Sequence, residues 1–90
     1  MIFLKHVQYR FHDQGDLQSK LAHVRYTATR VPGVRLRDFF ILLERDECIL
    51  VMECPNEVAY QEWRKLCPPP PGATDWVESA MLAEEWSKER

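Results

Sequence analysis

Three polar side chains near the N-terminus have the types needed for acid–base chemistry. His6, Gln8 and Arg10 occupy alternate positions of a segment in which polar and apolar residues alternate, so in an extended strand they point to the same side. An imidazole can remove a proton from a phenol or an activated carbon, and a neighbouring guanidinium stabilises the oxyanion that results. We therefore treat His6 and Arg10 as candidate catalytic residues and Gln8 as a candidate ligand-binding residue.

The same row of residues also suits a structural role. The sequence shows no carboxylate that would orient the His6 ring, and a histidine alone is weak evidence of catalysis. Polar residues on one strand face can equally form hydrogen bonds in a wet seam between two copies of the chain. Both interpretations stay open.

Aromatic side chains form a second candidate site, for an apolar ligand. Tyr60 and Trp63 are three residues apart in a predicted helix, and Phe39 and Phe40 lie in a predicted strand. Because sites for small molecules are mostly apolar cavities with a few polar groups, these four are candidate ligand-binding residues. Aromatic residues at helical spacing are more often ordinary core, and this is the competing interpretation.

The three cysteines do not have the spacing of a metal site. Cys48 and Cys54 lie on one predicted strand, about 20 Å apart at the rise of a strand, so they cannot hold one metal within a chain. Cys67 lies at the C-terminal end of a predicted helix, where the helix dipole disfavours a thiolate. We expect reduced, structural thiols and no metal.

Composition limits the class of protein. The 90 residues predict a single domain over residues 1–90, and the 12 basic and 14 acidic residues are interspersed, without the basic patch that nucleic acid requires. No apolar stretch approaches the roughly 18 residues that span a bilayer, and the N-terminus turns polar too soon for a signal peptide. We expect a soluble, cytoplasmic protein with no nucleic-acid or membrane partner.

Periodicity predicts the elements that position the N-terminal residues. Alternation over residues 3–11 predicts a strand, and apolar residues at helical spacing over residues 17–31 predict a helix with Asp16 as its N-cap. Pro32 and Gly33 would end this helix.

A hairpin and a second helix are predicted next. Residues 35–44 and the almost continuously apolar residues 48–54 predict two paired strands. Asn56 would cap a helix that the proline run from Pro68 stops. Its inner stripe contains five residues: Ala59, Tyr60, Trp63, Leu66 and Cys67.

Residues 74–90 fit either a helix or a strand. Because the order β-α-β-β-α-β is that of a ferredoxin-like sandwich, which needs a fourth strand, we expect a helical turn near Asp75 and a strand over residues 79–86. The predicted fold is thus α+β, an antiparallel sheet with helices on one face.

The other face of the predicted sheet needs a cover, which a second copy placed sheet against sheet would provide. The alternative is that residues 74–90 form a third helix on that face.

Short motifs in this order resemble the dimeric α/β-barrel superfamily, which includes antibiotic-biosynthesis-type monooxygenases and stress-responsive barrel proteins. The opening Leu4-Lys5-His6-Val7 is similar to the start of the latter group. Two junctions are similar to those of both groups: Val31-Pro32-Gly33-Val34, and Glu53-Cys54-Pro55-Asn56-Glu57 leading into Ala59-Tyr60 and Trp63. The resemblance covers about residues 2 to 67.

The resemblance implies a homodimeric barrel with a cavity for a small aromatic or polyketide-like molecule and, as in several members, no cofactor. His6 matches the catalytic strand histidine of cyclase-type members, whose second histidine is replaced here by Cys67 and prolines. Trp63 matches a helix tryptophan of haem-degrading members, but their strand asparagine and haem-ligating histidine have no match. This argues against haem.

Two functions remain open. One is a cofactor-independent oxygenase, cyclase or isomerase with His6 as base and Arg10 as its electrostatic partner. The other is a non-catalytic ligand-binding protein, or an accessory protein that interacts with a larger partner. Replacing His6 with alanine separates them, because only the enzyme would lose turnover.

Overall fold

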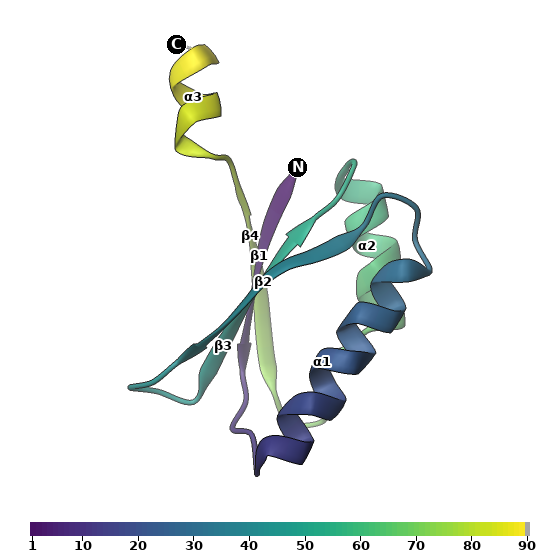
Figure 1. Cartoon of the computed structure of the whole chain (residues 1–90), viewed down its shortest axis with the longest axis vertical. Coiled ribbons are helices and arrows are strands. Elements are labelled where there is room, and N and C mark those ends of the chain that lie inside the picture. Colours follow the sequence, from purple (N-terminus) through teal and green to yellow (C-terminus); the bar gives the residue numbers. More distant parts are fainter. Residues whose placement is uncertain (90) are drawn as a thin grey trace.

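Seven elements follow one another in the computed structural model, which describes residues 1–89. They are β1 (Ile2–Gln8), α1 (Gln14–Thr29), β2 (Arg35–Leu42), β3 (Glu47–Glu53), α2 (Glu57–Leu66), β4 (Thr74–Ala80) and α3 (Ala83–Glu89). The strands form one antiparallel sheet in the order β2-β3-β1-β4, and α1 and α2 cover one of its faces (Figure 1). This confirms the ferredoxin-like fold predicted from the sequence.

The N-cap of α1 lies three residues before the predicted one. The Asp13 carboxylate accepts a hydrogen bond from the backbone N–H of Asp16 at 2.8 Å, which makes Asp13 the N-cap. The prediction of Asp16 as the cap was wrong, because its carboxylate is engaged elsewhere. It accepts hydrogen bonds from the Tyr9 hydroxyl at 2.9 Å and from the His12 backbone N–H at 3.0 Å.

Helix α2 begins as predicted. The Asn56 side chain accepts a hydrogen bond from the Ala59 backbone N–H at 2.8 Å, so Asn56 is the N-cap. Leu66 was wrongly assigned to the inner stripe, since it is 46% exposed. The other four predicted members of the stripe are buried.

The turn between α1 and β2 packs against the start of α2. Gly33 has φ of +79°, a conformation that side chains disfavour. A Cβ there would lie 2.5 Å from Cγ of Pro55. Glycine therefore lets the two junctions approach, which fixes α1 relative to β3 and α2.

The core lies between the two helices and the sheet. Trp63, Tyr60 and Met52 are its largest fully buried side chains, and the Phe3 ring stacks on Tyr60 with centroids 4.6 Å apart. The Trp63 indole N–H donates to the Thr27 hydroxyl at 3.1 Å, a buried link between α2 and α1. These contacts hold both helices against the same face of the sheet.

The C-terminal elements differ from the prediction in their order. Strand β4 pairs with β1 from Thr74 to Ala80, where a helical turn was expected, and α3 follows where the strand was expected. Thr74, Trp76 and Val77 favour a strand, whereas the Ala- and Glu-containing residues 83–89 favour a helix. The alternative of a third helix on the uncovered face is also wrong, because α3 extends beyond the end of the sheet (Figure 1).

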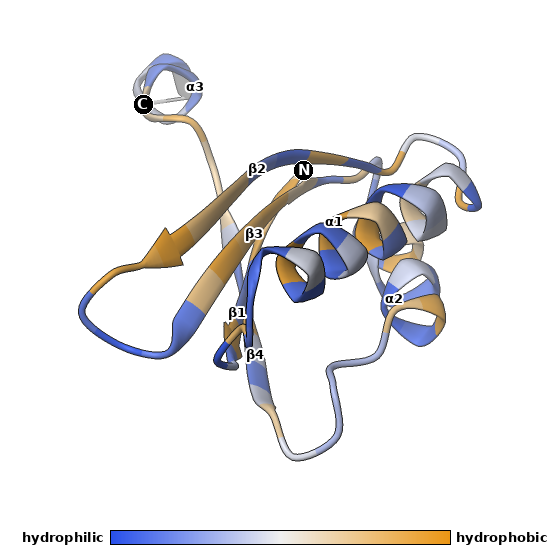
Figure 2. Ribbon diagram, turned by 60° about the horizontal axis from the view of Figure 1, so that its bottom comes forward, coloured by the Kyte–Doolittle hydropathy of each residue, from blue (hydrophilic) through white to orange (hydrophobic). Residues whose placement is uncertain are grey.

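The face of the sheet away from α1 and α2 has no cover within the described chain (Figure 2). We call it the open face. Strand register places seven large apolar residues on it: Ile2, Leu4, Phe40, Leu42, Ile49, Val51 and Trp76. Phe40 is 54% exposed there. Among residues 1–89, no helix is long and apolar enough to cross a membrane.

Candidate functional site

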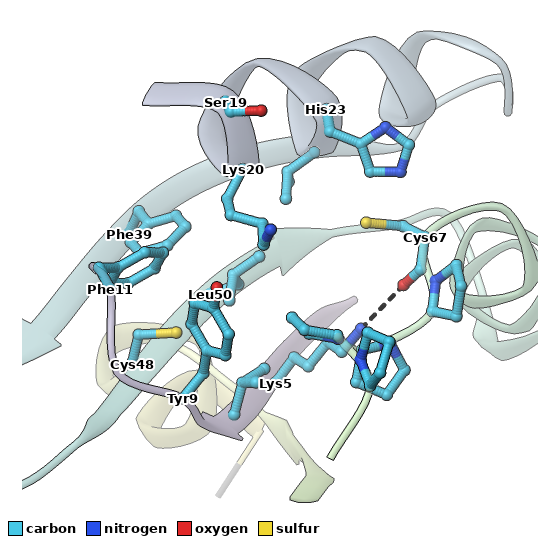
Figure 3. A pocket seen from close by; sticks show the side chains of 16 residues that line it. Lys5, Tyr9, Phe11, Ser19, Lys20, His23, Phe39, Cys48, Leu50 and Cys67 are labelled. Carbon is cyan, nitrogen blue, oxygen red and sulfur yellow. Dashed lines mark hydrogen bonds between the residues drawn. The ribbon is translucent and has the colours of Figure 1, made fainter. Parts of the chain in front are cut away.

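A pocket of about 390 Å³ lies on the helix-covered side of the sheet. We call it the α1 pocket, because α1 forms one wall, β1, β2 and β3 form the floor, and residues 67–71 form the opposite wall (Figure 3). Aromatic rings line much of it: Tyr9 lies 5.2 Å from Phe11, and Phe11 lies 6.2 Å from Phe39, measured between ring centroids. Its walls are therefore mainly apolar.

A lysine lies in this apolar pocket. Lys5 is only 3% exposed, and its ammonium donates a hydrogen bond to the Cys67 carbonyl oxygen at 3.1 Å (Figure 3). The same nitrogen lies 4.9 Å from the centroid of the Trp63 ring, a cation–π contact. Burial lowers the pKa of Lys5 below its usual value, because the charged form loses its hydration.

The position of Lys5 follows from the alternation of β1. Phe3, Lys5 and Val7 are all buried, whereas the residues between them are not, so Lys5 points toward the helices together with the two apolar residues. Sequence reasoning missed this residue. The available signal was a lysine on the apolar parity of a half-buried strand, a position where charged residues are rare.

The wall opposite α1 is stiff. Cys67 ends α2, and four consecutive prolines follow it, each with its φ angle fixed by the ring. The chain then turns at Gly72, which has φ of +82°. Because the Cys67 carbonyl begins this stiff segment, the hydrogen-bond acceptor of Lys5 is held in place.

Other polar side chains also line the α1 pocket, among them Tyr9, Ser19, Lys20, His23 and Cys48. Lys20 lies 3.4 Å from the Asp16 carboxylate, which also accepts from the Tyr9 hydroxyl. That hydrogen bond is the main reason why the pKa of Tyr9 is raised. Burial raises the pKa of the Cys48 thiol to about 11, so the thiol keeps its proton near neutral pH.

His6 lies on the open face, on the other side of β1 from Lys5. Its ring stacks on Trp76, with centroids 5.0 Å apart and planes 6° from parallel. Nε2 lies 2.8 Å from a Glu78 oxygen and Nδ1 lies 3.7 Å from a Glu47 oxygen. Despite these distances, neither ring nitrogen has a partner with hydrogen-bond geometry in the described part of the chain.

Comparison with known proteins was made by sequence and by structure. No family model and no curated protein matches the sequence. Among solved structures, the protein Rv0793 from Mycobacterium tuberculosis has a TM-score of 0.55 at 15% identity, over 89% of this chain and 93% of that chain. A candidate antibiotic biosynthesis monooxygenase from Bordetella bronchiseptica has a TM-score of 0.53 at 17% identity, over 90% and 98%. Another from Nitrosomonas europaea has a TM-score of 0.50 at 9% identity, also over 90% and 98%.

This chain has the fold of the antibiotic biosynthesis monooxygenase-like proteins. The similarity extends over nearly the whole of each solved chain, and it confirms the fold that the sequence motifs implied. At such low identity it shows the arrangement of the elements and assigns no role to any residue.

Within this monooxygenase-like fold, two of the three polar residues proposed from the sequence line a common cavity. Gln8 and Arg10 line a second cavity of about 400 Å³ near the β2–β3 turn, together with Glu47. His6 is not among the residues that line it. Strand β1 ends at Gln8, two residues short of Arg10, so the expected row of three side chains on one strand face does not form.

The four proposed aromatic residues are also separated. Phe39 lines the α1 pocket, whereas Phe40 lies on the open face. Tyr60 and Trp63 are buried in the core, and Trp63 reaches the pocket only through its contact with the Lys5 ammonium. Among the described residues, no group of three or more His, Cys, Asp and Glu side chains is arranged to hold a metal ion.

Proposed function

We propose that this chain binds a small aromatic or polyketide-like molecule in the α1 pocket. The observation that carries the proposal is the pocket itself: about 390 Å³, within the size range of small-molecule sites, with aromatic walls and few polar groups. The rings of Tyr9, Phe11 and Phe39 offer faces and edges to a flat ligand.

Binding of 1-naphthol, followed by isothermal titration calorimetry, tests this proposal. Ser19 is an exposed residue of α1 that lines the pocket, so Ser19→Trp should obstruct the pocket without disturbing the core. We expect the dissociation constant to rise at least about tenfold, or about 1.4 kcal/mol. Gln18→Trp is the matched control, because Gln18 is exposed on α1 and does not line the pocket. Equal effects of the two variants, or no binding to the unmodified protein, would exclude the α1 pocket as the site.

The proposed reaction class is that of a cofactor-independent oxygenase, cyclase or isomerase. Such reactions begin with removal of a proton from a phenol or an activated carbon. His6 is the proposed base for a ligand that reaches the open face, where Glu78 and Glu47 flank its ring, and Arg10 is its proposed electrostatic partner. If His6→Ala still binds a screened phenol and loses its turnover, the enzyme is supported. Unchanged turnover would leave a protein that only binds.

We also propose that the protein is a homodimer that pairs through the open face. Apolar residues on all four strands of that face have no cover among residues 1–89, and apolar patches of this kind mark interaction surfaces. A second copy is the proposed partner, because two identical faces can cover one another about a twofold axis. It would also enclose the buried nitrogens of His6.

A further inference from the structure

We infer that the α1 pocket selects ligands with an oxygen anion on an aromatic ring, a phenolate or a carboxylate, and that Lys5 is the residue that recognises the anion. The inference rests on the proposed function, because it names the chemical class of the ligand in the same pocket. Four observations support it: the burial of Lys5, its missing counter-ion, its remaining donor and the lack of a carboxylate among the described residues that line the pocket.

Within the described chain, Lys5 is a buried basic residue without a carboxylate partner. Four other basic side chains do have one: Lys20 with Asp16, Arg35 with Glu53, Arg45 with Glu47 and Arg64 with Asp75. Those cations reach the surface, whereas Lys5 is almost fully buried. A buried charge is usually paired, so the unpaired ammonium leaves room for a counter-ion from outside the chain.

The carboxylate with the strongest influence on the pKa of Lys5 already has a partner. Asp75 lies on the neighbouring strand β4, and its charge opposes the lowering of the Lys5 pKa. Both carboxylate oxygens of Asp75, however, accept hydrogen bonds from Nη2 of Arg64, at 3.3 and 3.1 Å. The Asp75 carboxylate therefore pairs with Arg64 and cannot fully compensate the positive charge of the Lys5 ammonium.

One N–H of the Lys5 ammonium remains for a ligand. An ammonium has three donors; one is used by the Cys67 carbonyl, and the face of Trp63 attracts the ammonium on another side. Lys5 is itself a lining residue of the α1 pocket. A ligand oxygen in the pocket can thus take the third donor.

The surroundings favour an anion that is attached to a ring. Charges attract more strongly in an apolar pocket than in water, because the effective dielectric constant is lower. The titratable residues that line the pocket with Lys5 are Tyr9, Lys20, His23, Cys48 and Cys67. Lys20 already has Asp16 beside it, and Cys48 keeps its thiol proton. No carboxylate is among the described residues that line the pocket, so the Lys5 ammonium lies beside aromatic walls without an anion of the chain in the pocket.

A titration of bound 4-nitrophenol tests the inference, because its anion is yellow and its acid is colourless. The absorbance of the bound probe is followed against pH and compared with that of the free probe. We expect the ionisation constant to rise at least about tenfold on binding, since the ammonium stabilises the phenolate. In Lys5→Met the constant should instead fall below that of the free probe, because burial alone disfavours an anion. Lys65→Met, on the exposed side of α2, should behave like the unmodified protein.

Competition for the bound probe distinguishes the two kinds of anion and needs no variant. Benzoate and benzamide have the same shape and differ in charge, so benzoate should displace the probe at a concentration at least about tenfold lower. Equal competition by the two compounds shows that the carboxylate arm of the inference is wrong, and a bound phenol that ionises no more readily than the free one shows the same for the phenolate arm. Both results together overturn the inference while the proposed binding function stands. Absence of binding by both 1-naphthol and 4-nitrophenol would contradict the proposed function itself.

Discussion

Lys5 occupies a position where an uncharged side chain would fit with less loss of hydration. Its aliphatic part lies between Phe3 and Val7 on the buried side of β1, and a methionine of similar length would pack there without a charge to desolvate. Residues that weaken folding in this way are often retained for function. The stability of the chain should therefore report the cost of this charge directly.

Lys5→Met is expected to raise the free energy of unfolding at pH 7 by about 1 kcal/mol. The gain from removing a buried charge is partly offset, because the Cys67 carbonyl loses its hydrogen bond. Chemical denaturation with the Trp fluorescence as readout would measure it. A loss of several kcal/mol would contradict the view that the charge is costly to the fold.

The advantage of Lys5→Met should shrink as the pH rises toward 10.5. Burial lowers the pKa of Lys5 below its ordinary value of 10.5, so between the two values the unfolded chain holds a proton that the folded chain has released. The unmodified protein therefore gains stability with rising pH over this window, and the variant does not. Cys48, with its pKa raised from 9.0 to about 11, acts in the opposite sense above pH 9, but it does so in both proteins. Unfolding at pH 7, 9 and 10 tests the difference, and parallel curves would contradict it.

Tyr60→Phe should leave the free energy of unfolding unchanged or raise it by up to about 1 kcal/mol. The Tyr60 hydroxyl is buried and has no hydrogen-bond partner within residues 1–89, and this burial also raises its pKa to about 12. Phenylalanine keeps the ring that stacks on Phe3 and removes the unpaired hydroxyl. Tyr26→Phe, at an exposed position of α1, is the control for urea denaturation. A loss above about 1 kcal/mol in Tyr60→Phe alone would show that the hydroxyl has a stabilising partner.

The helices and strands were predictable wherever one local pattern dominated. Alternation identified β1, the apolar run identified β3, and the Asn56 cap identified the start of α2. Prediction failed where two local patterns competed. Asp13 and Asp16 both suit an N-cap, and the hydrogen bond from Tyr9, a tertiary contact, occupies Asp16.

The order of β4 and α3 had the same kind of ambiguity. Periodicity over residues 74–90 fits both types of element, and pairing with β1 decides between them. Thr74 pairs with Gln8 directly after the turn at Gly72, so the strand begins as soon as the chain reaches the edge of the sheet. The point at which the chain reaches β1 depends on the tertiary fold, and no local pattern in the sequence indicates it.

Removal of α3 is expected to weaken the proposed dimer and leave the α1 pocket intact. Isolated helices of this length are marginal in water, and α3 extends away from the sheet and the other two helices (Figure 1), so contact with a second copy would stabilise it. A chain that ends at residue 82 should have a dimer dissociation constant at least about tenfold higher in sedimentation equilibrium. Its affinity for 1-naphthol should be unchanged. An unaltered dimer constant would mean that α3 has no part in pairing.

The two sides of the sheet have different roles in these proposals, and β1 contributes to both. Lys5 points into the α1 pocket, and the next residue, His6, lies on the open face against Trp76. The sequence allowed the prediction of a sheet with one uncovered face, because the apolar residues of its strands outnumber those that two helices can cover. It did not allow the prediction of the pocket, whose walls come from β1, α1, β2, β3 and the proline run, and whose size depends on how these elements pack.

Val51→Lys tests pairing through the open face. Val51 lies in the middle of β3, beside Leu4 on β1 and Asp38 on β2, so a second sheet packed on this face would bury the new ammonium. Asp38 beside it would compensate the new charge only in part, so burying the ammonium still costs free energy, and we expect the dimer dissociation constant to rise at least about tenfold. Val58→Lys is the matched control, since Val58 is 67% exposed on α2 and lies on the other side of the sheet.

Sedimentation equilibrium of the three proteins, with 1-naphthol binding measured in parallel, separates a lost interface from a lost fold. If Val51→Lys is monomeric and still binds 1-naphthol, each copy contains a complete α1 pocket. This result is expected, because residues of a single chain line the pocket. If both properties are lost together while Val58→Lys is unaffected, pairing is needed to hold the sheet that forms the pocket floor. A Val51→Lys protein that dimerises as well as the unmodified one would place the interface elsewhere, and His6 would then lie at a solvent-exposed surface.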